Sequence, residues 1–110
     1  MIFQLVPLPD GSKLDWSVTT QLNGTDVQLR YLYNTRLGYW TLQMNAPSGE
    51  VMLAGQVVKP RRNLMTRITS EDRSMGVMFL VWNEASKVEL PGRTDLGNYC
   101  RMLFAYEEDQ

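Results

Sequence analysis

Apolar and polar residues alternate with a period of two along much of the first half of the chain. The alternation runs through residues 14–22, 27–33 and 39–45. Because successive side chains of a strand point to opposite sides, this pattern predicts strands with one buried and one solvated face. Trp16 and Trp40 fall on the predicted buried faces. We therefore expect both indole rings to be largely buried.

The segments between these strands carry turn residues. Asn23-Gly24 separates the first two strands, and both residue types tolerate the positive φ of a type I′ hairpin turn. Pro and Gly in the segment 46–49 predict another turn. Together these signals predict a meander of four antiparallel strands over residues 14–58. Gly55, inside the fourth strand, indicates a bulge or a close backbone approach.

Three further strands are predicted outside the meander. They cover Ile2–Val6, the apolar run Gly76–Trp82 and the C-terminal segment Tyr99–Tyr106, and a short acidic tail follows at 107–110. The pattern predicts an all-β chain, with residues 1–110 forming a single small antiparallel β-sandwich or barrel of about seven to eight strands.

Composition narrows the possible chemistry. The chain has 110 residues, no histidine, one cysteine, and 11 basic against 12 acidic residues. It therefore offers no His-dependent triad, no internal disulfide and no Cys-rich zinc site, and it fits a reducing cytoplasm. The longest apolar run falls far short of the ~20 residues that cross a bilayer. We expect no enzyme activity, no cofactor, no metal, no small-molecule substrate and no membrane insertion.

The side chains that could still support catalysis stand in no recognisable motif. The carboxylates Asp15, Asp26, Glu84 and Asp95 are expected to be strand-edge and turn residues, and an acid/base pair of the glycosidase type is the alternative. Cys100 lies in a strand pattern, and a catalytic thiol usually needs a nearby histidine. We expect Cys100 to be a small buried apolar residue.

The local concentration of positive charge at Lys59, Arg61 and Arg62 suggests a binding surface. Small β-barrels can bind single-stranded nucleic acid through basic loops and stacked aromatic rings. The candidate stacking residues are Tyr31, Tyr33, Tyr39 and Trp40, although three of these four fall on a predicted core face. The net charge of −1 also opposes this hypothesis. A solvated loop, or a loop that forms salt bridges at a protein interface, is the other interpretation.

The run Gly76–Trp82 is apolar on both faces, so one face must enter the core while the other needs its own cover. One interpretation places Met78, Leu80 and Trp82 on the outer face as an interface with a partner protein, since exposed apolar surface marks such sites. The other buries the strand on both sides within the chain's own sandwich. We name Met78, Leu80 and Trp82, with Lys59, Arg61 and Arg62, as candidate interface residues.

Several short motifs follow one another in an order and spacing that resembles a family of small phage proteins. They are Leu22-Asn23-Gly24, Leu29-Arg30-Tyr31, Gly38-Tyr39-Trp40-Thr41-Leu42, Leu53-Ala54-Gly55, Asn63-Leu64 and Asp95-Leu96-Gly97. Over most of residues 20–106 the chain resembles the baseplate plug proteins of contractile-tailed phages, the type first recognised in a cyanophage baseplate. The sequence departs from the family pattern in Pro60–Ser74 and in Gly76–Trp82.

This resemblance implies a structural virion protein with no catalytic residues. It would pack with tube-initiator and hub proteins of the tail baseplate and plug the tail tube. Its partners would be other baseplate and tail-tube proteins in a symmetric multi-copy assembly, built after synthesis in the host cytoplasm. The alternative function is a small β-barrel module that binds single-stranded nucleic acid.

Overall fold

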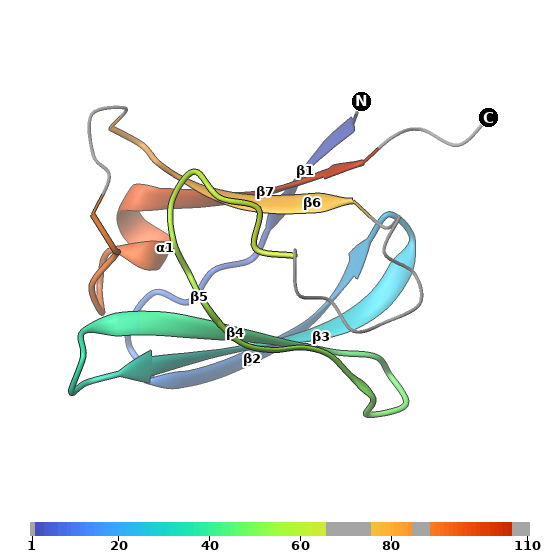
Figure 1. Cartoon of the computed structure of the whole chain (residues 1–110), viewed down its shortest axis with the longest axis horizontal. Helices are drawn as coiled ribbons and strands as arrows, with labels where there is room; N and C mark the ends of the chain where they lie inside the picture. The colour runs from blue at the N-terminus through green and yellow to red at the C-terminus, as the bar shows by residue number, and fades with distance from the viewer. Residues whose placement is uncertain (1, 66–75, 85–88, 107–110) are drawn as a thin grey trace.

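Two antiparallel β-sheets pack face to face in the computed structural model, which describes residues 2–65, 76–84 and 89–106 (Figure 1). The predicted all-β sandwich is confirmed, and the described residues contain seven strands and one helical turn. The elements are β1 (Ile2–Val6), β2 (Asp15–Leu22), β3 (Thr25–Asn34), β4 (Tyr39–Asn45), β5 (Val51–Val57), β6 (Val77–Trp82), α1 (Leu96–Tyr99) and β7 (Cys100–Tyr106).

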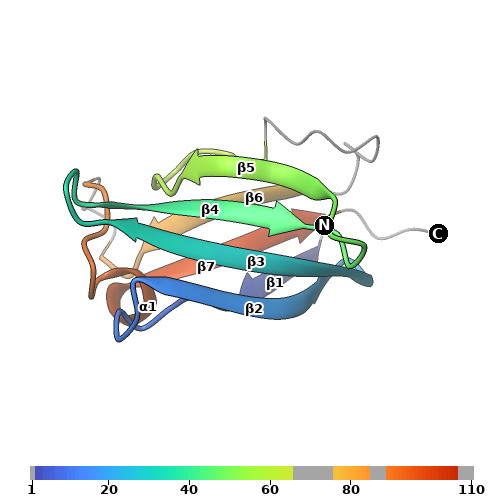
Figure 2. The same cartoon turned by 90° about the horizontal axis from the view of Figure 1, so that it is seen from below.

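The predicted meander forms the four-stranded sheet, in the order β2-β3-β4-β5 (Figure 2). Asn23 and Gly24 join β2 to β3 with φ of 52° and 77°, the two positive values of a type I′ turn. The predicted bulge is also confirmed. Leu42 pairs with Gln56 and Met44 with Leu53, so Ala54 and Gly55 oppose the single residue between Leu42 and Met44.

The remaining strands form the second sheet, in the order β1-β7-β6. This sheet pairs the first and last described strands, β1 and β7, with Ile2 opposite Tyr106 and Val6 opposite Met102 in an unbroken register. The C-terminal strand begins at Cys100, because Leu96–Tyr99 form the short helix α1. The predicted acidic tail at 107–110 lies outside the described residues.

Side chains from the facing sides of the two sheets make the core. Trp40 and Tyr31 are fully buried, as the alternation predicts. Trp16 is partly buried and packs against the core, whereas Trp40 has no exposed surface. The difference follows from position in the sheet, because Trp16 lies on the edge strand β2 and has a neighbouring strand on one side only. Trp16 still packs at 5.8 Å, centroid to centroid, against Tyr31.

Two side-chain hydrogen bonds tie the sheets to the connecting segments. The Tyr31 hydroxyl donates to the carbonyl oxygen of Pro7 at 3.1 Å, beside the end of β1. The Trp40 indole N–H donates to the carbonyl oxygen of Gly92 at 3.0 Å. Each buried ring thus keeps its polar atom bonded. Within the described ranges, no helix is long and apolar enough to cross a membrane.

Candidate assembly surface

Strand β6 turns the predicted interface residues Met78 and Leu80 toward the four-stranded sheet. Both have an exposed fraction of 0% and belong to the core. The prediction that they face away from the core is therefore wrong. The opposite face of the strand carries Val77, Phe79 and Val81, and it stays partly open, with Val77 38% exposed. The alternative interpretation buried this strand on both sides within the chain's own sandwich. It is also wrong at Val77, because that side chain is exposed.

The register of the β1-β7-β6 sheet aligns these outward side chains in rows. Ala105 of β7 pairs with Phe3 on one side and with Val77 on the other. Leu103, two residues earlier, pairs with Leu5 and with Phe79. Directly paired residues of antiparallel strands share a face, so each row is a continuous apolar strip across three strands. Arg101, paired with Val81, adds a cation at the end of this surface.

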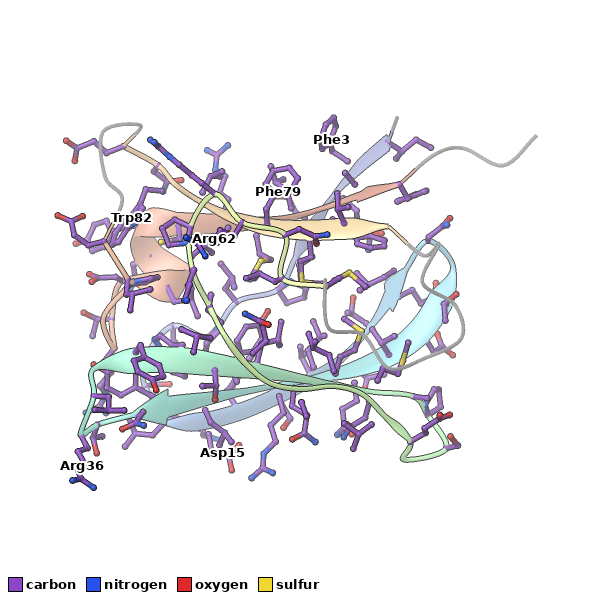
Figure 3. The ribbon with its side chains drawn as sticks, in the orientation of Figure 1. Phe3, Asp15, Arg36, Arg62, Phe79 and Trp82 are labelled. Carbon is purple, nitrogen blue, oxygen red and sulfur yellow. The ribbon has the colours of Figure 1, made fainter. Side chains whose placement is uncertain are left out.

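This set of residues is called here the outer face: Phe3, Leu5, Val77, Phe79, Val81, Arg101, Leu103 and Ala105. Phe3 is 59% exposed and Leu5 is 66% exposed. Phe3 and Phe79 point away from the other sheet (Figure 3). A contiguous apolar patch on a protein surface usually marks an interaction site. The outer face is the strongest candidate site in the described part of the chain.

The sequence contained a signal for Phe3 and Leu5 that the pattern analysis did not use. Residues 2–6 read Ile-Phe-Gln-Leu-Val, so a strand there carries apolar residues on both faces. One face must then point outward, but the pattern alone does not tell whether it is the face of Phe3 and Leu5 or that of Ile2 and Val6. The same reasoning singled out Gly76–Trp82 as a strand with two apolar faces. One interpretation then placed Met78 and Leu80 on the outer face, which in the structure carries Val77 and Phe79.

Trp82, the third apolar residue of the predicted interface, lies at the end of β6. Its ring is partly buried and packs against the core, and its indole N–H donates to the carbonyl oxygen of Glu89 at 2.9 Å. Trp82 also lines a cavity of about 460 Å³, together with Glu84, Asp95 and Tyr99. An interface role for Trp82 remains a prediction.

The basic residues Lys59, Arg61 and Arg62 lie in the segment that follows β5. The backbone N–H of Arg61 donates to the carbonyl oxygen of Leu80 at 2.9 Å, which places this segment along the edge of β6. Lys59 and Arg62 line a cavity of about 340 Å³. Nucleic-acid binding would need stacking rings beside these cations. Tyr31 and Trp40 cannot serve, because both are fully buried. Tyr33 and Tyr39 are partly buried, and the ring of Tyr33 packs against that of Trp40 at 5.1 Å, centroid to centroid.

The carboxylates singled out in the sequence lie in different places. Asp15 forms a bidentate pair with Arg30, with distances of 3.0 and 2.7 Å, and this pair holds the pKa of Asp15 below its usual value. Asp26 accepts from the side chain of Gln21 at 2.8 Å. Asp95 accepts from the backbone N–H of Gly92 at 2.8 Å, and it shares the larger cavity with Glu84.

Cys100 is buried, as predicted. Burial, with a smaller contribution from the charge of Asp95, raises the pKa of its thiol to about 11. A thiol of this kind forms little thiolate near neutral pH. Among the described residues, no group of three or more His, Cys, Asp or Glu side chains is placed to hold a metal ion.

The geometry is that of a small β-sandwich with a partly exposed apolar face on its three-stranded sheet. The family model described as cyanophage baseplate Pam3 plug gp18 matches residues 3–108. The chain belongs to this family, which makes it a structural protein of the virion, in the baseplate of a phage tail. The resemblance found in the sequence is thereby confirmed. No curated protein gives a significant match to the chain.

Proposed function

We propose that this chain plugs the tail tube by packing with the tube-initiator and hub proteins of the baseplate through its outer face. The family match supports a place in the baseplate among other baseplate proteins. The observation that carries the proposal is the pair of apolar strips across β1, β7 and β6, because they leave Phe3 and Leu5 in solvent unless a partner covers them.

We also propose where the chain is made and what kind of assembly it joins. The chain is synthesised and assembled in the host cytoplasm and enters a symmetric multi-copy assembly. The mechanism is burial of apolar surface, which contributes about 25 cal/mol for each Å² removed from water. It requires no catalytic group and no bound small molecule. Arg101, at the end of the outer face, can add one salt bridge to an acidic residue of a partner.

A matched pair of leucines tests the proposal. Leu5 on the outer face and Leu37 in the β3–β4 loop are 66% and 61% exposed. Leu5→Ser and Leu37→Ser therefore make the same chemical change at similar exposure. We expect both variants to fold with little change in melting temperature, since neither side chain is in the core.

The readout is incorporation into baseplates, measured in phage particles assembled with each variant in place of the unmodified protein. We expect Leu5→Ser to reduce incorporation about tenfold, as the loss of one well-packed apolar contact would do, and Leu37→Ser to leave it unchanged. Equal incorporation of the two variants would remove the outer face from the proposal.

A further inference from the structure

The cavity of about 340 Å³ that Lys59 and Arg62 line is called here the basic cavity. It lies between the bulge of β5 and the segment 58–65, which crosses from the four-stranded sheet to the edge of β6 (Figure 1). Its volume is well above the ~30 Å³ share of one water molecule, so it has room for a side chain. It shares no residue with the outer face. The lining residues are Gly55, Gln56, Val57, Lys59, Arg62, Asn63 and Leu64.

The polar side chains of the basic cavity are mostly hydrogen-bond donors. Lys59 and Arg62 carry donors and no acceptor. The side-chain oxygen of Asn63 accepts from two backbone N–H groups, at 3.0 and 3.2 Å. Because both partners are donors, the amide orientation of Asn63 is fixed, and its Nδ2 group is left to donate to a ligand. Gln56 donates its side-chain N–H to the carbonyl oxygen of Val57 at 3.1 Å. The described lining residues include no carboxylate.

The two cations of the basic cavity stand on backbone that is anchored on both sides. Val58, just before Lys59, is fully buried, and its N–H donates to a backbone carbonyl oxygen of β4 at 2.9 Å. Leu64, two residues after Arg62, is also fully buried, and its N–H donates to a carbonyl oxygen of β6 at 2.7 Å. A segment held in this way loses little conformational freedom when it binds a ligand, which favours affinity.

A left-handed residue lies between these anchors. Arg61 has a φ of 62°, which is uncommon for a residue other than glycine. Its N–H donates to the carbonyl oxygen of Leu80 at 2.9 Å, so the edge of β6 holds this turn. Backbone conformations of this kind concentrate at binding sites. Arg62 lines the basic cavity and Arg61 does not, so the two adjacent arginines have different surroundings.

The positive charge of the basic cavity is not compensated within the described part of the chain, where neither Lys59 nor Arg62 forms a salt bridge. Two cations that line one cavity repel each other, and an anion between them replaces this repulsion by attraction. A carboxylate can accept two parallel hydrogen bonds from the planar guanidinium of Arg62, while Lys59 adds a point charge. The donor set therefore selects an anion with several acceptor atoms.

Proteins and nucleic acids both carry such anions, and two observations favour a protein. The net charge of the chain is −1, and no aromatic ring that could stack on a base is among the described lining residues. We propose that the basic cavity binds an acidic side chain of another protein molecule in the baseplate, held by Lys59, Arg62 and Asn63. This inference rests on the proposed function for the place of the partner, and it adds a polar contact to the apolar outer face.

A peptide titration of the full chain, followed by NMR, tests the basic cavity. The probe is the acidic peptide Ala-Tyr-Glu-Glu-Asp-Gln, which has the sequence of residues 105–110, and the control peptide carries Gln, Gln and Asn in place of the three acidic residues. We expect the acidic peptide to shift the side-chain signals of Arg62 and Asn63, less so at high salt, and the neutral peptide to leave them unchanged. Equal shifts from both peptides, or none from either, would overturn the inference.

The adjacent arginines provide matched variants for this titration. Arg62→Gln and Arg61→Gln remove the same charge from neighbouring positions, but only Arg62 lines the cavity. We expect about a fivefold loss of peptide affinity for Arg62→Gln and a change below about twofold for Arg61→Gln. Lys59→Gln should weaken binding like Arg62→Gln, and it serves as the second test if Arg62→Gln does not fold. Equal losses for the two arginine variants would overturn the inference, since general positive charge would then explain the binding.

Single-stranded DNA is the competing ligand in the same titration. We expect an oligothymidylate to bind no more tightly than the acidic peptide at the same salt concentration, because the described lining residues offer no stacking ring. Tighter binding of the DNA, lost in Arg62→Gln, would overturn the inference in favour of nucleic acid.

Incorporation into phage baseplates is the closing readout. We expect Arg62→Gln to be incorporated about fivefold less than Arg61→Gln. Equal incorporation would overturn the inference, and a defect of Leu5→Ser in the same assay would then leave the proposed function standing. Normal incorporation of Leu5→Ser would count against the proposed function itself.

A further variant in the same assay distinguishes two sources of the acidic side chain. It carries amides in place of the acidic residues 107–109. Met102 lies opposite Leu80, and β7 then runs on to Tyr106, which leads these acidic residues away from the basic cavity of their own chain. An equal defect of this variant supports the inference with a second copy as the partner. Normal incorporation beside a defective Arg62→Gln supports it with a different baseplate protein.

Discussion

Trp40 and Gly92 are joined by a hydrogen bond across 52 residues of sequence, from the indole N–H to the carbonyl oxygen at 3.0 Å. The bond connects a central strand of the meander to the segment that leads into α1 and β7. The ring itself lies between the two sheets with no exposed surface. One side chain therefore contributes both to the core and to the attachment of the second sheet.

Replacement of Trp40 by Ala should cost about 3–5 kcal/mol of the free energy of unfolding, the range for a large buried aromatic residue. Trp16→Ala is the matched control, and it should cost clearly less because Trp16 is only partly buried at the edge. Chemical denaturation of both variants measures the difference. Equal costs would contradict the assignment of β2 as an uncovered edge.

Two glycines should respond differently to substitution by Ala. A Cβ on Gly97 would clash with the carbonyl oxygen of Pro9, so Gly97→Ala must displace backbone and should cost about 2 kcal/mol or more. Gly24 has open space around it but a φ of 77°, so Gly24→Ala should cost about 1 kcal/mol from strain alone. Thermal unfolding of both variants tests this order. If Gly24→Ala lowered the melting temperature more than Gly97→Ala, the close contact between Gly97 of α1 and Pro9 would be contradicted.

The thiol of Cys100 should react slowly in the folded protein. With a pKa of about 11, roughly one molecule in a thousand carries the thiolate at pH 8, and the side chain is buried as well. We expect labelling by a thiol reagent to be more than tenfold slower than in the denatured protein. Fast labelling of the native state would indicate frequent opening near α1.

Folding stability should be flat from about pH 6 to 8, because the chain has no histidine. The pKa of Asp15 is lowered by Arg30, so this pair stabilises the protein above the ordinary pKa of 3.8 and the contribution is lost as the pH falls through the lowered value. The pKa of Tyr31 is raised by burial, so stability should also fall above about pH 10. Denaturation curves across this pH range test both the expected loss of stability at acidic pH and the expected loss at alkaline pH. A steep change near neutral pH would reveal a displaced carboxylate.

Replacement of Lys59, Arg61 and Arg62 by Ser should leave the fold intact, because none of these side chains belongs to the core. The unmodified protein should show no tight, salt-sensitive retention of single-stranded DNA, since its net charge is −1 and two of the candidate stacking rings, Tyr31 and Trp40, are fully buried. Fluorescence anisotropy at two salt concentrations measures this. Tight binding that weakens steeply with salt, and that the triple variant loses, would favour the nucleic-acid hypothesis.

The local parts of this fold were predictable from the sequence. The meander follows from alternation and turn residues, and Asn23 and Gly24 have the positive φ values that their types predict. The helix α1 was not predictable, since four residues are too few to show a helical period. The pairing of β1 with β7 joins the two ends of the chain without a turn, so no short-range pattern marks it.

The candidate site was predictable only in part, and for a physical reason. Alternation tells which residues share a face, but it assigns that face to the core only when the other face is polar. In β6 both faces are apolar, so Met78 and Phe79 are equivalent by pattern. The packing of the whole sheet decides between them. Trp16 shows the same limit, because alternation does not reveal whether a strand is central or at an edge.

The pairing of Ile2 with Tyr106 has a mechanical consequence. The two residues are directly opposite each other at one end of the β1-β7 ladder (Figure 1). A load that pulls these two points apart acts along the hydrogen bonds and strains one pair of residues at a time, as in unzipping. The sheet with the outer face therefore yields stepwise from this corner under tension, and the meander is loaded only after β1 has peeled away.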